Sequence, residues 1–571
     1  MTPGDIAMLL NETSGLRVQI TSPALGAANV RVQGLRGRYT QVLADGLPLY
    51  GQTGSIGILQ IPPLDLGQVE VIKGVASALY GSSALGGVIN LVSRRPAEPR
   101  LEVLQNVTSH NGSDTVFWLA APRKEGQWSS TLLGGAHFQG RSDIDNDGYT
   151  DLPEYKRGVL RPRFFWENDK GKSVFLTGGA MAEDRAGGSI PFPEELRTRR
   201  LDGGVVARFV TGDRLIALRG SVMNGRHRRQ FGAVTERDSQ STVFSEATVS
   251  GSGDGHLWTL GSSWQLDRYR NQTVSGFDYT YSVPSLFAQD EYSPNTVVTF
   301  SGSGRLDFHN RYGTFFSPRI SALIRLPHAF TTRISTGTGV FAPTPFTEET
   351  EAVGLSNLQP LRSLKAEKAW SGSGDLGWSA SHVEVNGTLF GSRITRPVMV
   401  RPPVGGSTGF EIVNAPEPTR TVGTEFLARL RSGDFGLTFT HTFVHSTEMN
   451  VEENRRNDVP VTPKHTAGIV GTWEKEGKGR IGLEAFYTGN QRLDHNPFRT
   501  SSNPYWVFGV LVERRFGAVR LFVNGENIGN VRQTRYDPLV RPDRNFDGRW
   551  IVDAWAPLDG RVINGGVRLA F

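Results

Sequence analysis

The sequence predicts an all-β membrane barrel of about 22 antiparallel strands, whose lumen is filled by an N-terminal α+β plug domain. From residue 97 to residue 571, segments of about ten residues alternate apolar and polar side chains, as strands with one lipid-facing side do. No apolar run approaches the roughly 18 residues that a membrane helix needs. The chain also contains 68 Gly and 31 Phe, and only 21% of its residues are charged.

The plug prediction comes from residues 1–96, where strands, turns and one short helix are mixed. The segments 69–72 and 88–92 are apolar enough to form strands, and 76–80 can form one helical turn. Asp5 is placed to cap a helix that Gly15 ends. The apolar face of this helix comprises Ile6, Leu9 and Leu10.

The barrel prediction covers residues 97–571, and the alternation is clearest in the last strand. Val567 and Leu569 fall on one face of this strand, and Asn564 and Arg568 on the other. The same alternation recurs in the segments 383–389, 481–488 and 519–526. A soluble β-sandwich also alternates, but an open sheet of this length leaves unpaired edges, which closure into a barrel removes.

Three linked motifs occur in the first 96 residues. They read VRVQGLRG from Val30, VLADGLPL from Val42 and GQVEVIKGVASALYGSSALGGVINLVS from Gly67. Together they resemble the plug domain of TonB-dependent outer-membrane receptors. Later segments are similar to the barrel motifs of that family, in their usual order: 304–309, 317–321, 339–346, 524–530 and the terminal Phe571.

The resemblance implies a receptor in the bacterial outer membrane for active uptake of a scarce nutrient, such as a ferric siderophore or a cobalamin-like ligand. It also implies capture of this small-molecule ligand by external loops and energy coupling through the TonB–ExbB–ExbD complex. The alternative is a passive or adhesive outer-membrane barrel without energy coupling. No Ser, His and carboxylate arrangement has the setting of a catalytic site, so we predict no enzyme. We expect a monomer.

The N-terminal sequence Met1-Thr-Pro-Gly-Asp has neither the basic nor the apolar region of a secretory signal. In the family, a signal peptide and a TonB-binding box precede the plug. We therefore expect an N-terminally truncated sequence or a start at an internal methionine, with energy coupling dependent on sequence upstream of Met1.

The orientation follows from a plug on the periplasmic side, because strand 1 then runs outward. The external connections are expected near 140–155, 185–197, 226–237, 270–282, 343–360, 400–410, 448–460, 492–502 and 531–558. Shorter periplasmic connections are expected near 123–127, 169–172, 251–254, 327–331 and 432–435. Short periplasmic turns and longer external loops are typical of such barrels.

The external segment 143–154 matches the twelve-residue calcium loop in full. Its expected ligands, with Gly148 at the sharp turn, are Asp143, Asp145, Asp147, the carbonyl of Tyr149, Asp151 and Glu154. The alternative is a solvated acidic loop, and Pro153 argues against the helix that follows an ordinary EF-hand loop. We predict a Ca²⁺ site in which the carboxylates at positions 1, 3, 5 and 12 converge.

Plug arginines are expected to hold the plug inside the barrel. In the family, plug arginines pair with barrel glutamates at comparable motifs. The resemblance therefore implies that Arg36, or else Arg31, pairs with Glu367, Glu425 or both. The alternative is that each of these side chains faces the water of the lumen.

Charge and composition restrict the remaining partners. The net charge of +6 is small for 571 residues, and no basic tract is present, so we expect no nucleic-acid partner. Arg226-His-Arg-Arg is expected to form a basic external loop that contacts lipopolysaccharide phosphates. Membrane lipid is expected as a further partner. The absence of Cys excludes disulfides and thiolate metal sites. The segment 341–360 resembles the boxes of haem receptors, but 344–356 contains no His, which disfavours haem.

Overall fold

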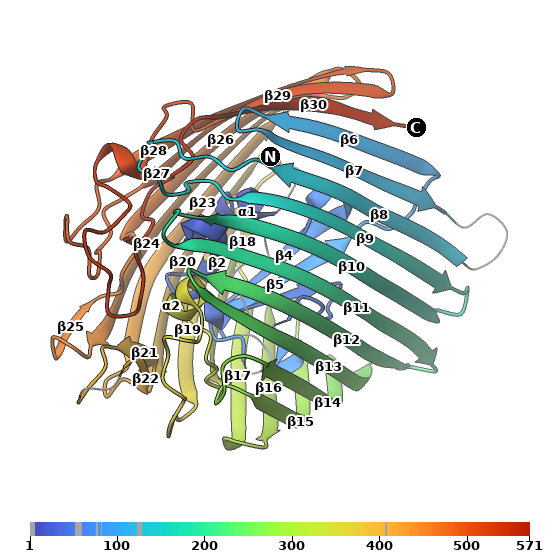
Figure 1. Ribbon diagram of the computed structural model, residues 1–571. Coiled ribbons are helices and arrows are strands. Elements are labelled where there is room, and N and C mark those ends of the chain that lie inside the picture. The colour runs from blue at the N-terminus through green and yellow to red at the C-terminus, as the bar shows by residue number, and fades with distance from the viewer. Residues whose placement is uncertain (1–5, 52–59, 76–77, 82, 123–127, 406–407) are drawn as a thin grey trace.

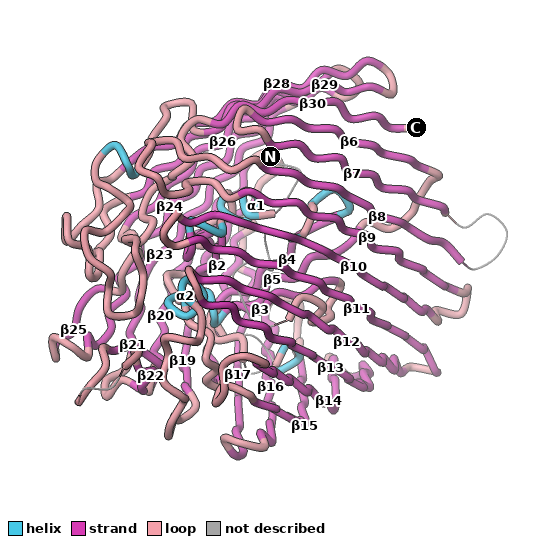
Figure 2. Tube along the Cα trace, viewed as in Figure 1, coloured by secondary structure: helices cyan, strands magenta, loops and turns pink. Residues whose placement is uncertain are grey.

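A computed structural model describes residues 6–51, 60–75, 78–81, 83–122, 128–405 and 408–571. A closed antiparallel barrel of 22 strands surrounds the N-terminal domain (Figure 1; Figure 2). The predicted fold class and strand number are therefore confirmed. No helix in the described part of the chain is long and apolar enough to cross a membrane.

Each barrel strand pairs with its neighbours along the chain, and the last strand pairs with the first to close the barrel. The barrel strands are β6 (Arg100–Thr108), β7 (Gly112–Ala121), β8 (Trp128–Gln139), β9 (Glu154–Glu167), β10 (Ser173–Gly188), β11 (Pro193–Thr211), β12 (Arg214–Phe231), β13 (Val234–Gly253), β14 (His256–Asn271), β15 (Tyr279–Tyr292), β16 (Val298–His309), β17 (Gly313–Arg325), β18 (Phe330–Phe341), β19 (Glu367–Ser379), β20 (Val383–Thr395), β23 (Thr419–Ser432), β24 (Phe435–Asn450), β26 (His465–Lys475), β27 (Gly479–Thr488), β28 (Tyr505–Phe516), β29 (Val519–Glu526) and β30 (Val562–Ala570).

Shorter elements lie in the connections between barrel strands. The strand β25 (Arg455–Asp458) pairs with β24, and β21 (Val398–Arg401) pairs with β22 (Glu411–Asn414) as a separate hairpin. The helix α2 (Glu348–Val353) follows β18, and the 3₁₀ turn η6 (Gln533–Arg535) follows β29.

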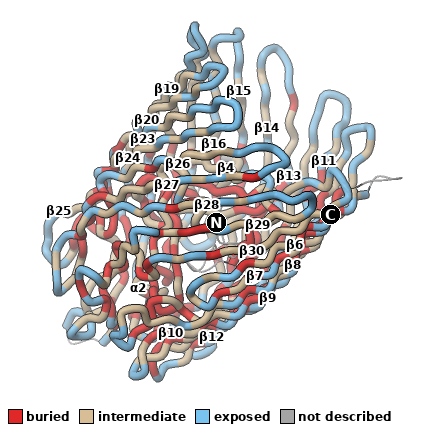
Figure 3. Tube along the Cα trace, turned by 90° about the horizontal axis from the view of Figure 1, so that it is seen from above, coloured by how far each residue is buried: buried red, intermediate tan, exposed pale blue. Residues whose placement is uncertain are grey.

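The alternation places apolar side chains toward lipid and polar ones toward the lumen. Leu389, Leu483 and Val523 are 66%, 58% and 58% exposed on the outer face, whereas Asn524 is 2% exposed. Buried residues gather toward the inside of the barrel in the view from above (Figure 3). The predicted inward and outward faces of these segments are confirmed.

The strand lengths correct two expected external loops. β11, β12 and β13 contain 19, 18 and 20 residues, so the segments 185–197 and 226–237 are largely strand. Only 189–192 and 232–233 connect these strands. The predicted strands end where the apolar outer face ends. The backbone ladder continues beyond it, because hydrogen bonds between strands do not depend on which side chains face outward.

The stretch Arg226 to Arg229 consequently lies within β12 and not in a loop. Arg226 and Arg228 are exposed on the outer face. His227 and Arg229 contact Asp238 of β13 instead, at 2.7 and 3.4 Å. Only alternate residues of the expected basic loop can therefore face the membrane surface.

The plug contains two small sheets inside the barrel. The strands β1 (Leu16–Ser22) and β2 (Ala27–Val32) form a hairpin, and β5 (Gly87–Ser93) lies between β3 (Thr40–Ala44) and β4 (Leu66–Lys73). The predicted strands at 69–72 and 88–92 are therefore confirmed. The helical elements are α1 (Ala7–Asn11), η1 (Pro23–Leu25), η2 (Gly37–Tyr39), η4 (Pro63–Asp65) and η5 (Ala78–Tyr80).

Helix α1 differs from its prediction at its C-terminal end. It ends at Asn11 and not at Gly15. The amide of Glu12 makes the last bond to a carbonyl four residues back, that of Met8, whereas the amide of Thr13 bonds to Leu10, only three residues back, and so tightens the final turn. Gly15 has a φ of +71° at the entry to β1. The expected cap at Asp5 and the expected helical residue Ala76 lie outside the described residues.

The plug has its own apolar core beneath these sheets. Its buried members are Ile6, Leu10, Leu16, Ala28, Val30, Val32, Ile61, Ile89 and Leu91. This core joins α1, the β1–β2 hairpin and the three-stranded sheet. The plug is therefore a packed domain, and this core supports its external face.

Candidate functional site

The candidate site lies where the connection between β18 and β19 folds inward onto the plug. This connection contains α2, whose N-terminus is closed by two hydrogen bonds between Thr347 and Thr350. The amide of Thr350 donates to the Thr347 hydroxyl at 3.3 Å, and the Thr350 hydroxyl accepts from the Thr347 amide at 2.8 Å. This reciprocal pair stabilises the helix start in the manner of a capping box.

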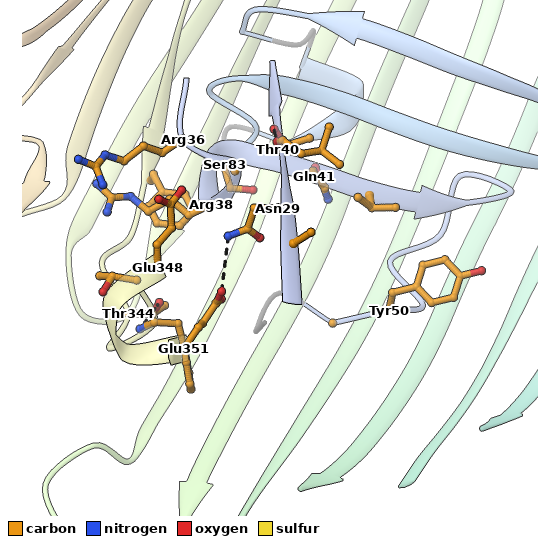
Figure 4. A pocket seen from close by; sticks show the side chains of 18 of the residues that line it. Asn29, Arg36, Arg38, Thr40, Gln41, Tyr50, Ser83, Thr344, Glu348 and Glu351 are labelled. Atoms are coloured by element: carbon orange, nitrogen blue, oxygen red, sulfur yellow. Dashed lines mark hydrogen bonds between the residues drawn. The ribbon is translucent and has the colours of Figure 1, made fainter. Parts of the chain in front are cut away.

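Acidic residues at the start of α2 contact the plug. Arg31 donates through Nη2 to both carboxylate oxygens of Glu348, at 2.8 and 3.1 Å. Asn29 donates to Glu351 at 3.5 Å (Figure 4). Acids near a helix N-terminus are also favoured by the backbone dipole. Helix α2 is therefore attached electrostatically to the plug.

The Arg31–Glu348 pair is well shielded from solvent. The side chains are 3% and 20% exposed. Arg31 also donates through Nη1 to the carbonyl of Pro460 at 2.9 Å and to the hydroxyl of Thr462 at 3.1 Å. One plug side chain thus connects α2 with the connection between β25 and β26.

A pocket of about 130 Å³ lies between the plug and α2 (Figure 4). Its charged and hydroxyl lining includes Arg36, Arg38, Tyr50, Thr344, Glu348 and Glu351. A second cavity, of about 80 Å³, is lined by the same plug arginines and by Asp547 and Arg549 of the β29–β30 connection. The plug and the external connections thus meet in a polar, charged interior.

Glu349 of α2 adds a further charge contact at this junction. Arg36 lies 3.8 Å from Glu349, and Arg549 is nearby. Burial raises the pKa of Glu349, but the positive charges of Arg36 and Arg549 outweigh it and lower the pKa below its usual value. Glu349 is therefore held as a carboxylate.

The predicted plug–barrel residues all lie at this interface, but their pairing was wrong. Arg36 donates to Glu448 of β24 at 2.8 Å, and not to Glu367 or Glu425. Arg31 pairs with Glu348 of α2. Arg36 stands before the 3₁₀ turn η2, and its place against the barrel wall follows from the folded turn. Position around the barrel wall is a tertiary property.

The two predicted glutamates have other plug partners. Glu367 of β19 is fully buried, accepts from the Tyr39 hydroxyl at 2.6 Å and pairs with Arg38 at 3.3 Å. Glu425 of β23 pairs with Lys73 and accepts from Gln33 at 2.7 Å.

Sequence reasoning missed Arg38, Tyr39, Lys73 and Glu448. The sequence could have identified Glu448, because alternate residues of β24 face the lumen and Glu448 is in line with Val444 and Ser446, which do so.

The acidic segment forms a compact external turn beside the plug. Asp143, Asp145 and Asp151 place one carboxylate oxygen each within 4.8 Å of one another. None of the three forms a salt bridge with a residue in the described ranges. The amide of Ile144 donates to Asp151 at 2.8 Å, and Gly148 takes a φ of +86°.

The pKa of Asp151 reflects this setting. Burial, together with the charges of Asp145, Asp147 and Asp143, raises it to about 6, although the Ile144 amide lowers it. A cation of high charge density among these oxygens would relieve the repulsion.

Two expected carboxylate ligands are not among these three, Glu154 and Asp147. Glu154 is the first residue of β9, and its carboxylate lies 3.7 Å from the Lys156 ammonium. Asp147 accepts from the Tyr149 amide at 2.7 Å. Of the four carboxylates predicted to converge, those at positions 1 and 3 do so, and Asp151 at position 9 joins them. Positions 5 and 12 are not in the group. At position 12 the strand begins and fixes the side chain on its outer face.

External connections also pack apolar side chains against one another and the plug. One cluster joins Tyr269, Phe346, Val398 and Phe410, from four different parts of the chain. Another joins Ala24 of the plug with Tyr149 and with the connection between β29 and β30. Together these contacts form a cover over the external side of the plug.

A closed barrel of this size, with a folded domain inside and loops closed over it, defines a plugged outer-membrane barrel. The chain matches the model of the TonB-dependent receptor plug domain over residues 2–88. It matches the TonB-dependent receptor-like β-barrel model over residues 127–528, more than half of its length. The protein belongs to the TonB-dependent receptor family and is a protein of the bacterial outer membrane. Members of this family are transporters and receptors, not enzymes.

Curated relatives support this membership at low identity. The chain is 23% identical over 488 residues to the iron-regulated outer membrane virulence protein of Vibrio cholerae, covering 78% of this chain and 74% of that protein. It is 27% identical over 401 residues to a vitamin B12 transporter of Photobacterium profundum, covering 66% of this chain and 62% of that protein. The second alignment spans less than two thirds of the relative's length.

Solved structures share the fold. A variant of the ferric enterobactin receptor of Pseudomonas aeruginosa, in complex with enterobactin, aligns with a TM-score of 0.83 at 16% identity. An iron transporter of Neisseria meningitidis aligns with a TM-score of 0.78 at 14% identity. Each alignment covers 100% of this chain and 97% of the other chain.

Proposed function

We propose that the protein is a receptor for active, TonB-coupled uptake of a scarce nutrient such as a ferric siderophore or a cobalamin-like ligand. The observation that carries the proposal is the attachment of the plug to both the barrel wall and the external loops through polar contacts. Lys73–Glu425 joins the plug to the wall, and Arg31–Glu348 joins it to an external loop. A pulling partner can break such contacts without unfolding the barrel.

The external cover must open for a ligand to reach the plug. The pocket of about 130 Å³ is smaller than the roughly 300–1,000 Å³ that drug-sized ligands occupy. Displacement of the 342–366 connection, with α2, would enlarge this pocket toward the outside. Ligand binding then competes with the contact between α2 and Arg31.

The names of the relatives guide the choice of ligand class. A ferrioxamine receptor and a vitamin B12 transporter are among them, and both names point to a small-molecule ligand. The proposed energy source is the TonB–ExbB–ExbD complex. Closure of the barrel within one chain supports a monomer.

The test is transport of a panel of labelled ligands by cells that produce the protein. The panel contains ferric catecholates, ferric hydroxamates and cyanocobalamin, with uptake measured with and without a protonophore and in a strain lacking the coupling complex. We expect one ligand to accumulate only in energised, coupling-competent cells. Uptake that continues in both de-energised conditions would support the alternative, a passive barrel, and binding of cells to surfaces without uptake would support an adhesin.

We further propose Ca²⁺ as a structural cation of the external turn 143–152. The donor set supports it: three carboxylates without a cationic partner among the described residues, and a buried member, Asp151, at 5% exposure. External calcium modules bind at about 10⁻⁴–10⁻³ M, so Ca²⁺ at about 100 times Kd should add about 2.7 kcal/mol.

Thermal unfolding with and without Ca²⁺ tests this second proposal. The wild type should show a higher Tm with Ca²⁺, and Asp145→Ala should abolish the increase. Asp213→Asn, in a periplasmic turn, is the matched control and should retain it. An unchanged Tm of the wild type across the titration would show that the segment is a solvated acidic loop without a structural Ca²⁺.

A further inference from the structure

Arg31 differs from the other arginines of the two cavities between plug and external connections. Its acidic partner within the described part of the chain is Glu348, which belongs to α2. The other four arginines have an acidic partner outside α2. These pairs are Arg36–Glu448, Arg38–Glu367, Arg492–Asp494 and Arg549–Asp547, at 2.8, 3.3, 3.1 and 2.7 Å. Displacement of α2 therefore removes the counter-charge of Arg31 and leaves the other four arginines paired.

Helix α2 packs with the external cover and not with the core of the plug. Its residues Ala352 and Val353 belong to the apolar cluster that contains Phe346 and Phe410. All buried members of this cluster lie between residues 269 and 412, outside the plug. The acidic side of α2 extends toward the plug instead (Figure 4). When the cover moves outward, α2 can keep its apolar packing and lose its polar contacts to the plug.

The site that α2 leaves behind on the plug is a buried cation. Arg31 is 3% exposed, and its Nη1 remains bonded to neutral oxygens of Pro460 and Thr462. Its Nη2 loses both hydrogen bonds to Glu348. A shielded charge without a counter-charge is costly, so the open state of the cover favours any anion that can take the place of Glu348.

The guanidinium group of Arg31 has one donor that Glu348 does not use. Both oxygens of Glu348 accept from Nη2, whereas Nε is buried and has no hydrogen-bond partner among the described residues. Nε and Nη2 lie on the same edge of the planar group, and one carboxylate can accept from both in a bidentate pair. A carboxylate that is not tethered to α2 can therefore pair with Arg31 more completely than Glu348 does.

We propose that Glu348 occupies Arg31 as a built-in substitute for a carboxylate group of the imported ligand. This inference rests on the proposed function, and it makes that ligand a carboxylate-bearing small molecule. Transient opening of the cover exposes Arg31, and the ligand carboxylate then holds the open state. Bound ligand and released α2 are thereby linked through one guanidinium group.

The surrounding charges limit the ligand to few carboxylates. Glu448, Asp547 and Asp553 line the smaller cavity beside Arg31. A ligand with several negative charges would meet these carboxylates at the same site, and like charges repel one another at such distances. The arrangement is therefore suited to a ligand that presents one carboxylate to Arg31 and is otherwise uncharged.

The test compares two ferric chelates that differ only in one terminal group. The probe is a linear ferric tris-hydroxamate that carries one terminal carboxylate, and the matched neutral chelate carries a carboxamide there. The full chain is purified in a neutral maltoside detergent, and Kd is measured by isothermal titration calorimetry. The wild type should bind the carboxylate chelate at least about tenfold more tightly, because it alone forms charged hydrogen bonds to Arg31.

Glu348→Gln gives an effect whose sign distinguishes a substitute from a ligand-binding residue. The variant should bind the carboxylate chelate at least about tenfold more tightly than the wild type, because the competing group is removed and α2 opens more often. Loss of a residue that contacts the ligand favourably would weaken binding instead. Arg31→Gln/Glu348→Gln should bind both chelates equally, and Glu98→Gln, at the periplasmic end of the barrel, should bind like the wild type.

Three results would overturn the inference. The first is equal binding, or no binding, of the two chelates by the wild type. The second is unchanged or weaker binding of the carboxylate chelate by Glu348→Gln. The third is tighter binding of a ferric tris-catecholate, which is a trianion without a carboxylate. Energy-dependent uptake of any other ligand by cells would leave the proposed function standing in each case, so the two failures are distinguishable.

Discussion

Replacement of Glu348 by Gln tests whether α2 is held on the plug by charge. The substitution keeps the size of the side chain but removes the carboxylate that accepts two hydrogen bonds from Arg31, at 2.8 and 3.1 Å. Arg31 is 3% exposed and keeps its bonds to Pro460 and Thr462, so its charge remains partly satisfied. Loss of one partly buried, charged interaction should cost about 2–3 kcal/mol.

This cost should appear as local opening of α2 and not as unfolding of the barrel. Hydrogen exchange reports such opening through the amides of Glu351 and Gly354, which bond to the carbonyls of Thr347 and Thr350. At 1.4 kcal/mol per tenfold change, their exchange should accelerate by about 30- to 150-fold. The matched control is Glu98→Gln, which breaks an exposed pair with Arg100 and should leave α2 unchanged.

A double-mutant cycle separates the pair from its surroundings. Arg31→Met should accelerate exchange in α2, and Arg31→Met/Glu348→Gln should do so by less than the sum of the two single effects. Exchange in α2 of Glu348→Gln within about twofold of the wild type would refute the reasoning, as would full additivity.

Two further predictions concern the fit and the protonation of the plug. Gly187→Ala in β10 should destabilise the protein by about 1–3 kcal/mol, because the new Cβ would overlap the Ala24 carbonyl of the plug. The control is Gly158→Ala, whose Cβ meets no heavy atom within 4 Å. Equal Tm values for both variants would contradict this reasoning. Burial, with the charge of Glu484, raises the pKa of Glu12 from its usual 4.5 to about 7, so its contribution to stability is present below about pH 4.5 and lost as the pH rises through 7. Glu12→Gln should therefore raise Tm at pH 8 and change it little at pH 5, and a Tm difference independent of pH would show that Glu12 is not perturbed.

The sequence alone determined the architecture. The period of two along each segment assigns lumen and lipid faces residue by residue, as Val523 and Asn524 show with 58% and 2% exposure. The strands 69–72 and 88–92 of the plug were equally readable, because glycines and short apolar runs are local signals. Inside a membrane, backbone groups must be satisfied within the barrel, so the local pattern leaves few alternatives to closure.

The tertiary structure decided which side chains meet. The alternation of side chains along each strand marked Glu367 and Glu425 as lumen-facing. Their plug partners are Arg38 and Lys73, however, and Arg36 pairs with Glu448. The external helix α2 and the convergence of Asp143, Asp145 and Asp151 were likewise not predicted in their final form. Each depends on where a strand stands around the barrel and how far it is shifted along its neighbours. The inward or outward direction of a side chain is set by its own backbone. Its position along the barrel axis and the residues that it contacts depend on the register of every strand in the closed barrel.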